Sequence, residues 1–167
     1  IIGIGHVGTR VAHLANAFGM TVLAYDPYVA ADDIVRRGAR SVSFDELLAQ
    51  SDFVSVHCPR TKETQGMLDA RAYARMKAGA IFITTARGGI HDEGALLSAL
   101  KSGHLAGAGL DVWDKEPPPL EHPLLKFDNV IATYHTAGVT HEARHDMAAQ
   151  AAEQIVGLLK GGRPPRL

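Results

Sequence analysis

The sequence predicts an α/β fold in which a doubly wound parallel sheet carries helices on both faces. Short apolar runs of strand length alternate with segments whose apolar residues recur about every 3.6 positions, a pattern typical of this class. The first apolar run is followed by Gly3, Gly5 and Gly8, and the second is followed by an acid, Asp26. In such a fold the strands run parallel, so we expect the residues that follow them to meet at one edge of the sheet.

Five apolar runs are predicted as strands after the two isoleucines that open the chain. They are bounded by residues typical of turns, and several contain β-branched residues. The runs are Thr21–Tyr25, Phe53–Cys58, Ala80–Thr84, Leu105–Leu110 and Val130–Thr133.

Helices are predicted from capping residues and apolar periodicity. An amphipathic stretch runs from Val7 to Phe18, with Gly19 as its stop. Ser43 with Glu46 forms a capping-box pattern, and Asp92 with Glu93 begins another helix. The last helix is predicted from about Thr140 to Lys160, where glycines 161 and 162 and then prolines 164 and 165 end it. The proline-rich stretch 115–123 is predicted as an irregular loop.

The glycine turn has the spacing of a Rossmann-type dinucleotide site. Gly3 allows the sharp bend, Gly5 allows backbone N–H groups to approach a pyrophosphate, and Gly8 allows the helix to pack closely on its strand. The helix N-terminus would bring a positive dipole end to the phosphates. Asp26, at the end of the next strand, would accept hydrogen bonds from the adenosine ribose hydroxyls. The sequence therefore predicts a bound dinucleotide.

Composition excludes several classes of function. The 167 residues suffice for one domain with a core, and the net charge of −1 offers no electrostatic footprint for nucleic acid or an anionic membrane. Cys58 is the single cysteine, so no internal disulfide is possible and a cytoplasmic location is expected. No apolar run approaches the roughly 20 residues of a membrane span, and no signal peptide is apparent. Only Ile1 and Ile2 precede the glycine turn, which predicts a part of a longer polypeptide.

Four motifs in the second half, together with the glycine turn, resemble those of the D-isomer-specific 2-hydroxyacid dehydrogenases. The resemblance covers nearly the whole chain, with the motifs in the same order. The four motifs are Thr84-Thr85-Ala86-Arg87-Gly88-Gly89, Asp92-Glu93-Gly94-Ala95-Leu96, Gly109-Leu110-Asp111-Val112-Trp113-Asp114-Lys115-Glu116-Pro117 and His135-Thr136-Ala137-Gly138.

The resemblance implies a catalytic trio of Arg87, Glu116 and His135. Arg87 would clamp the substrate carboxylate and polarise the 2-oxo group, a task that suits a planar, permanently charged guanidinium. His135 would be the general acid in reduction and the base in oxidation. Glu116 would orient the imidazole and favour its protonated form. The expected substrates are small 2-oxo and 2-hydroxy acids.

The implied cofactor is NAD. The charge of Asp26 would repel a 2′-phosphate, and neither Pro27 nor Tyr28 supplies a compensating cation, so NAD is expected over NADP. The remaining positions come from the glycine turn and from the family resemblance. The expected cofactor-binding residues are Gly3, Gly5, His6, Val7, Gly8, Asp26, Pro27, His57, Pro59, Thr64, Thr85, Ala86, Arg87, Asp111, His135 and Gly138.

The chain departs from the family pattern at three places. Thr84 stands where asparagine is usual before the arginine, and His91 stands where an aliphatic residue is usual. Tyr134 replaces the proline that commonly precedes the histidine, which puts the rigidity of the backbone around His135 in doubt because tyrosine does not fix φ. Among the other histidines, His13, His104 and His122 are expected on the surface.

A zinc site is not expected, although residues 141–145 match H-E-x-x-H on a helix. Zinc needs a third protein ligand, and Glu153, eight residues beyond His145, would lie about 12 Å from it along the helix axis. Thr140 as helix cap and Glu142 at the positive end of the helix dipole account for the stretch instead.

The domain organisation follows from the resemblance. Residues 1–167 are expected to form the dinucleotide-binding domain, while the N- and C-terminal parts of the substrate domain are expected to be absent. A homodimer is expected because the family pairs through its cofactor domains. The alternative is an NAD(H)-sensing interaction protein of the corepressor type, which shares the fold and the trio. The sequence does not indicate which 2-hydroxy acid is the substrate.

Overall fold

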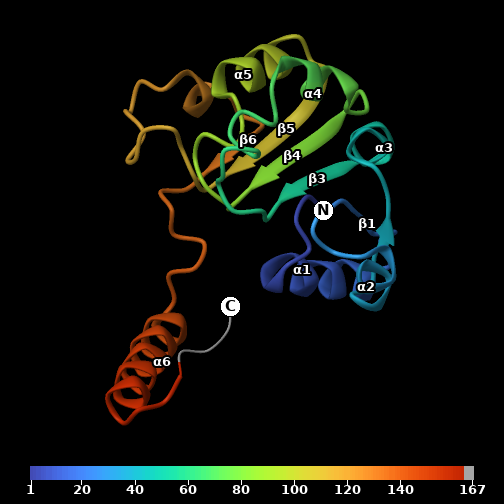
Figure 1. The fold of residues 1–167 in the computed structure, drawn as a ribbon. Helices are drawn as coiled ribbons and strands as arrows, with labels where there is room; N and C mark the ends of the chain where they lie inside the picture. Colours follow the sequence, from blue (N-terminus) through green and yellow to red (C-terminus); the bar gives the residue numbers. More distant parts are fainter. Residues whose placement is uncertain (164–167) are drawn as a thin grey trace. The chain divides into compact units, whose positions relative to one another are not determined.

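The computed structural model describes residues 1–163 and divides the chain into two compact units. The first unit spans Ile1–His135, and the second begins at Thr136. The first unit holds the sheet and every helix except the last (Figure 1).

All pairings in the sheet are parallel. The strands β3 (Phe53–Val56), β4 (Ala80–Thr84), β5 (Leu105–Leu110) and β6 (Val130–Ala132) lie side by side in that order. The strands β1 (Leu23–Ala24) and β2 (Arg40–Ser41) form a separate pair. Ile2 bridges Tyr25 on one side and Val56 on the other, so it links the pair to the four-stranded sheet.

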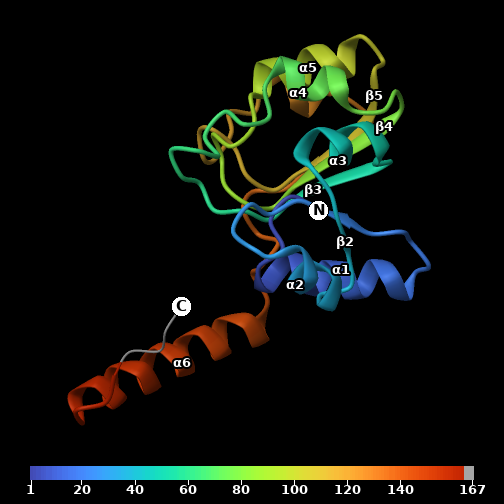
Figure 2. The ribbon, with the colours of Figure 1, turned by 45° about the vertical axis from the view of Figure 1, so that its right-hand side comes forward.

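Helices cover both faces of this sheet, as the sequence predicts. Figures 1 and 2 show α1 (His6–Ala17) and α2 (Ala31–Arg36) on one side of the strands. The helices α3 (Phe44–Gln50), α4 (Ala70–Arg75) and α5 (Glu93–Lys101) lie on the other side. A short 3-10 helix, η1 (Pro123–Lys126), precedes β6. The predicted doubly wound α/β class is confirmed.

The core divides into two clusters that follow the two layers of helices. Ile1 and Ile4 pack with Ala12 of α1 and Ile34 of α2, whereas Ile2 belongs to the larger cluster. Ile1 and Ile2 separate because successive side chains of an extended segment point to opposite faces. The turn at Gly3, where φ is 86°, then brings Ile4 to the cluster of Ile1. Each large apolar side chain buried in this way contributes about 1.5–3 kcal/mol. The larger cluster centres on β3, β4 and β5 and includes Leu47, Val54, Phe82, Leu96, Leu105 and Leu110.

The predicted helix starts are confirmed at three caps. The Ser43 hydroxyl accepts a hydrogen bond from the Glu46 N–H at 3.2 Å, and the Asp92 carboxylate accepts one from the Ala95 N–H at 2.8 Å. In the second unit, the Thr140 hydroxyl accepts a hydrogen bond from the Ala143 N–H at 3.0 Å. Each cap satisfies a backbone donor that the helix itself leaves free.

Three predicted strands are shorter in the structure, while two others agree fully; the predicted run Val130–Thr133 ends as a strand at Ala132. The run Thr21–Tyr25 contains only the two-residue strand β1, and Phe53–Cys58 ends as a strand at Val56. The Cys58 backbone, just after this strand, lies against the Gly3 turn. The predicted strands 80–84 and 105–110 match β4 and β5.

Two of the three histidines predicted at the surface are partly buried. His104 lies with Nε2 3.0 Å from the Tyr73 carbonyl oxygen, and the His122 side chain is only 17% exposed. The His122 ring packs edge-on against Trp113, and its Nε2 lies 3.1 Å from a Glu93 carboxylate oxygen. The prediction was wrong for both because their partners are distant in sequence. His13 is exposed, as predicted.

The second unit contains the helix α6 (His141–Leu159), close to the predicted bounds. Gly161 follows it with a φ of 84°, a conformation that suits the residue after a helix end. The predicted stop at prolines 164 and 165 lies outside the described residues. None of the helices within residues 1–163 combines the length and apolarity that a membrane crossing requires.

Candidate active site

Two cavities lie at the edge of the sheet where the strands end. One, here called the Asp26 cavity, has a volume of about 560 Å³ and follows β1 and β3. The other, the Arg87 cavity, has a volume of about 730 Å³ and follows β3, β4 and β5. Both are lined by the segment 57–59, so they share one wall. Ligands in open α/β sheets bind at this edge.

The glycines of the turn fall into two kinds: Gly3 and Gly8 have no space for a Cβ, whereas Gly5 does. Gly3 has a φ of +86°, and a Cβ there would lie 2.7 Å from the Cys58 nitrogen. A Cβ on Gly8 would lie 2.1 Å from the Gly3 carbonyl oxygen, so the helix α1 packs against the turn with no space for a side chain. Gly5, by contrast, has no atom within 4 Å of its Cβ position. The fold requires Gly3 and Gly8, whereas Gly5 leaves open space in front of the helix.

The first turn of α1 is free to receive an anion. Gly5 is the N-cap residue, and within the described part of the chain no side chain caps this helix and no acid stands in its first turn. The uncapped N–H groups at the start of a helix carry partial positive charge. Val7 lines the Arg87 cavity and Gly5 lines the Asp26 cavity, whereas His6, also predicted to bind the cofactor, lines neither of them.

Asp26 is half-buried and held by two backbone donors. One carboxylate oxygen accepts a hydrogen bond from the Ile4 N–H at 3.0 Å, and the other accepts one from the Tyr28 N–H at 3.0 Å. Each carboxylate oxygen has a second lone pair, so the group can still accept hydrogen bonds from ligand hydroxyls. Among the described residues, the lining of the Asp26 cavity contains no lysine or arginine.

The shared wall contributes an uncharged imidazole. His57 follows β3, and its Nε2 lies 2.9 Å from the Ser55 hydroxyl. Burial lowers the pKa of His57 to about 4, so the ring is neutral at neutral pH. Thr64 donates its hydroxyl hydrogen to the Pro59 carbonyl oxygen at 2.7 Å and thereby closes the loop after this wall.

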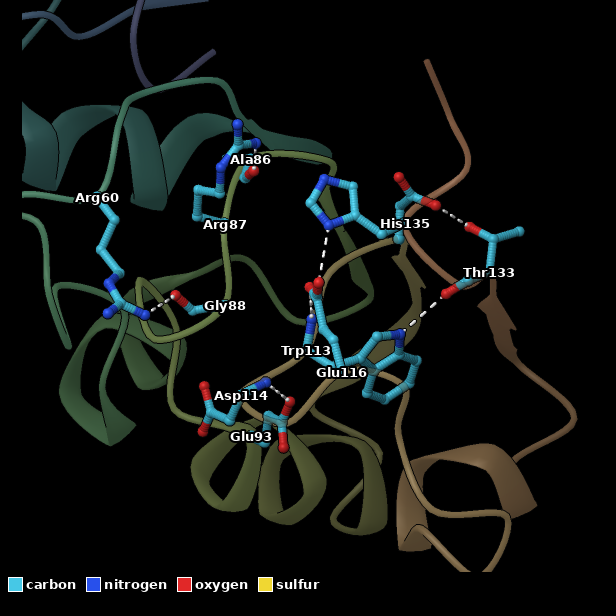
Figure 3. A network of polar contacts seen from close by, with 11 residues as sticks. Arg60, Ala86, Arg87, Gly88, Glu93, Trp113, Asp114, Glu116, Thr133 and His135 are labelled. Atoms are coloured by element: carbon cyan, nitrogen blue, oxygen red, sulfur yellow. Dashed lines mark hydrogen bonds and ion pairs between the residues drawn. The ribbon is translucent and has the colours of Figure 1, made fainter. Parts of the chain in front are cut away.

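The loop after β4 carries Arg87. Its guanidinium donates a hydrogen bond to the Ala86 carbonyl oxygen at 2.6 Å and lines the Arg87 cavity (Figure 3). A Cβ on Gly88 would lie 1.9 Å from the Trp113 carbonyl oxygen, so this loop packs tightly on the segment after β5. The Gly89 N–H donates to an Asp114 carboxylate oxygen at 2.7 Å and fixes the same contact.

Glu116 and His135 form the central contact of the site. His135 Nδ1 lies 2.8 Å from Glu116 Oε2, and the other carboxylate oxygen accepts a hydrogen bond from the Trp113 N–H at 3.1 Å (Figure 3). The hydrogen bond with His135 lowers the pKa of Glu116, and the Trp113 N–H and the charge of Arg87 act in the same direction. Glu116 therefore stays ionised below its usual range.

Hydrogen bonds hold the His135 backbone despite Tyr134. His135 has a φ of 58°, a left-handed conformation that is uncommon outside glycine. Its N–H donates to the Asp111 carbonyl oxygen at 2.7 Å. The preceding Thr133 carbonyl accepts a hydrogen bond from the Trp113 indole at 2.9 Å (Figure 3). These bonds replace the restraint that a proline before His135 would provide.

The structure brings most of the predicted residues to the two cavities. Gly8 and Asp111 line neither cavity. Asp111 is buried and accepts a hydrogen bond from the Thr133 hydroxyl at 2.6 Å. His135 reaches the site through Glu116, and Gly138 belongs to the second unit. The predicted residues that line the Asp26 cavity are Gly3, Gly5, Asp26, Pro27, His57, Pro59 and Thr64. Those that line the Arg87 cavity are Val7, His57, Pro59, Thr85, Ala86, Arg87 and Glu116.

Several lining residues were not predicted. Arg60 donates a hydrogen bond to the Gly88 carbonyl oxygen at 3.2 Å, and Trp113 and Asp114 complete the same cavity. Tyr28 and Glu63 line the Asp26 cavity. All of these residues lie in loops that follow strands, so their position after a strand end is the sequence signal that could have identified them. Within residues 1–163, no three side chains of the metal-binding types gather closely enough to hold a metal ion.

The residues present fit a dinucleotide. The Asp26 cavity offers apolar side chains and a carboxylate, as an adenosine requires, and the uncapped start of α1 suits a pyrophosphate. The Arg87 cavity offers a guanidinium and a carboxylate paired with an imidazole, which suit a reacting group. Because residues 57–59 line both cavities, the two cavities are adjacent and one ligand could extend through both.

Comparisons with known proteins agree with this geometry. Residues 1–137 match the family model described as D-isomer specific 2-hydroxyacid dehydrogenase, NAD binding domain. The chain is 48% identical over 161 residues to a D-3-phosphoglycerate dehydrogenase from Archaeoglobus fulgidus, covering 96% of this chain and 31% of that protein. It is 44% identical over 167 residues to a glyoxylate reductase from Korarchaeum cryptofilum, covering 100% of this chain and 50% of that protein.

A solved structure shares the fold. The D-isomer specific 2-hydroxyacid dehydrogenase from Lactobacillus delbrueckii ssp. bulgaricus, in its NAD-complexed form, aligns with a TM-score of 0.90 and 34% identity, covering 98% of this chain and 53% of that chain. The chain thus spans half or less of the curated relatives described above. It belongs to the D-isomer specific 2-hydroxyacid dehydrogenase family, and its residues 1–137 correspond to the NAD-binding domain of that family.

Proposed function

We propose that this chain is the cofactor domain of an NAD-dependent oxidoreductase that interconverts D-2-hydroxy acids and 2-oxo acids. The observation that carries the proposal is the 2.8 Å contact between His135 Nδ1 and Glu116, beside a cavity that Arg87 lines. A cation, an acid–base group and its orienting carboxylate are what the reduction of a 2-oxo acid requires.

Arg87 would bind the substrate. Its guanidinium can grip a carboxylate with two parallel hydrogen bonds and place the adjacent 2-oxo group in the cavity. Among residues 1–163 the guanidinium donates to the Ala86 carbonyl oxygen, a bond that a stronger acceptor can displace. When bound, the nicotinamide cofactor supplies or accepts the hydride.

His135 would move the proton through Nε2. Because Nδ1 faces the ionised Glu116, this nitrogen carries a hydrogen, and Nε2 is the position left to exchange a proton with the substrate oxygen. Glu116 fixes the ring orientation through this contact. Since the pKa of Glu116 is lowered, this contact is kept at neutral pH and is lost only when acid protonates the carboxylate.

NAD rather than NADP is the proposed cofactor. The Asp26 carboxylate stands in a cavity whose described lining holds no lysine or arginine, so a 2′-phosphate would meet negative charge without compensation. The family assignment to an NAD-binding domain supports the same choice.

The remaining parts of the proposal concern the whole protein. The His135 and Glu116 side chains are 42% and 37% exposed, which supports a need for a second domain to cover the substrate and exclude water. A homodimer and a cytoplasmic location follow from the family resemblance and from the single cysteine.

Steady-state oxidation of NADH by a panel of 2-oxo acids tests the proposal. We expect the complete polypeptide to turn over at least one 2-oxo acid, and we expect the 167-residue chain alone to bind NADH but to turn over slowly. The proposal is wrong if the complete polypeptide oxidises NADH with none of the acids. Equal activity of the isolated chain would refute the need for a second domain.

A further inference from the structure

A second carboxylate stands at the mouth of the Asp26 cavity. Glu63 lies in the loop after β3, and Tyr28 lies just after β1, so the two residues come from different sides of the cavity that both line. The Tyr28 hydroxyl donates a hydrogen bond to the Glu63 carboxylate. This bond joins the two loops across the cavity rim and fixes the position of the Glu63 charge.

The two carboxylates that line the Asp26 cavity are both candidates to repel a phosphate. Asp26 and Glu63 line the cavity, and no lysine or arginine does so within the described residues. Both acids raise the pKa of the Tyr28 hydroxyl. The hydrogen bond to Glu63 has the largest effect, followed by the charge of Glu63, and the charge of Asp26 has a smaller effect. Tyr28 therefore lies within the electrostatic field of both carboxylates.

We propose that Glu63, held in place by Tyr28, is a second determinant of selectivity against a phosphorylated dinucleotide. The inference rests on the proposed function, because it assumes that the adenosine half occupies the Asp26 cavity. Asp26 is held by the N–H groups of Ile4 and Tyr28 and would contact the ribose hydroxyls directly. The Glu63 carboxylate accepts the Tyr28 hydroxyl hydrogen and keeps its charge, so it would act through space on any phosphate that enters.

The expected size of this effect is moderate. A 2′-phosphate carries between one and two negative charges at neutral pH, and Glu63 and Tyr28 are exposed, so water and salt screen the repulsion. A pair of like charges several ångströms apart in such surroundings changes a dissociation constant by about three- to tenfold. The contribution should shrink as ionic strength rises.

Three variants separate the charge from the link. Glu63→Gln removes the charge and keeps an acceptor for Tyr28. Tyr28→Phe keeps the charge and the ring but removes the link. Glu121→Gln is the matched control, because Glu121 is exposed and lines neither cavity. Dissociation constants of NADH and NADPH are measured for each variant of this chain by isothermal titration calorimetry at low and high salt.

We expect Glu63→Gln to improve the affinity for NADPH relative to NADH by about three- to tenfold at low salt and by less at high salt. Tyr28→Phe should give a smaller change in the same direction, and Glu121→Gln should give none. An unchanged ratio in Glu63→Gln, with normal NADH binding, overturns the role of Glu63. A Tyr28→Phe variant identical to the wild type overturns the anchoring role of Tyr28. A wild-type chain that binds neither nucleotide contradicts the proposed function itself.

Discussion

The two ends of the site are built in different ways. The Asp26 end is set by the backbone: glycines that the packing requires, and a carboxylate fixed by the N–H groups of Ile4 and Tyr28. The Arg87 end is set by side chains from loops that follow different strands, such as the contact of His135 with Glu116. The comparison teaches that backbone atoms fix one end and side chains fix the other. Contacts between segments distant in sequence build both ends, because Ile4 and Asp26 are 22 positions apart and Glu116 and His135 are 19 apart.

The difference predicts that the two ends fail independently. A change in a side chain at the Arg87 end should impair turnover and spare nucleotide binding. A change in the glycine turn should impair binding or the fold itself. Each of the following experiments tests that separation.

The largest effect is expected for His135→Asn. Loss of the acid–base group should lower kcat of the complete polypeptide by about 10²–10⁴-fold. The dissociation constant of NADH for the chain should be unchanged, because the proposed role of His135 is to exchange a proton with the substrate oxygen through Nε2. His13→Asn, at an exposed position of α1, is the control for both measurements. Parallel losses of turnover and NADH affinity in His135→Asn would contradict the separation.

A pair of glycine variants comes next. Gly8→Ala should lower the free energy of unfolding by up to about 3 kcal/mol, because its Cβ would meet the Gly3 carbonyl oxygen at 2.1 Å. Gly5→Ala should leave unfolding within about 0.5 kcal/mol of the wild type, because its Cβ points into open space, yet it should weaken NADH binding. Urea unfolding and NADH titration measure the two effects. If Gly5→Ala binds NADH as the wild type does, the phosphates lie elsewhere.

Arg87→Lys should act on the substrate alone. Lysine keeps the charge but lacks the planar fork that binds a carboxylate with two hydrogen bonds. We expect kcat/KM of the complete polypeptide for its 2-oxo acid to fall about ten- to thirtyfold, with unchanged NADH affinity. Arg75→Lys, at an exposed ion pair with Asp45, is the matched control. A kcat/KM equal to that of the wild type would exclude a two-pronged grip by Arg87.

The smallest effect concerns the stability of the core, where the His91 ring packs against Phe82. His91 is 2% exposed, and neither ring nitrogen has a hydrogen-bond partner among the described residues. Burial lowers its pKa from 6.5, so the unfolded chain takes up a proton more readily than the folded chain. The stability should therefore fall as the pH drops below 6.5 towards the lower pKa of the folded state. His91→Leu should add about 1 kcal/mol at pH 7.5 and should reduce this loss.

Urea unfolding at pH 7.5 and pH 5.5 checks the behaviour of His91. The exposed His13→Leu is the control, because it removes an imidazole that is already solvated. If His91→Leu loses as much stability as the wild type between the two pH values, then His91 is not the group that titrates. If the variant is less stable at pH 7.5, the ring nitrogens have partners such as buried water.

The sequence predicted the parts of the molecule that depend on local pattern. The class of the sheet, the strands β4 and β5, and the caps Ser43, Asp92 and Thr140 follow from residues close in sequence. The short elements β2 and α4 were not predicted, because segments of 2 and 6 residues carry too little periodicity. Their existence depends on tertiary packing.

The site was predictable to a similar extent. Family motifs identified Arg87, Glu116 and His135, and the structure brings Glu116 and His135 into contact. The partners of His122 and His104 were missed because both contacts join residues about 30 positions apart. The link between Tyr28 and Glu63 was missed for the same reason, since it spans 35 positions. Such pairs are defined only by the folded chain.

The central claim is that one dinucleotide occupies both cavities along their shared wall. An NMR titration of the ¹⁵N-labelled chain tests it most directly, with NADH compared against ADP-ribose, which lacks the nicotinamide. We predict that NADH shifts the amide signals of Gly5 and Tyr28 together with those of Gly88 and the Trp113 indole, at one common affinity. ADP-ribose should shift the first pair alone. Signals that respond at only one end with NADH, or that respond with different affinities, would contradict the claim.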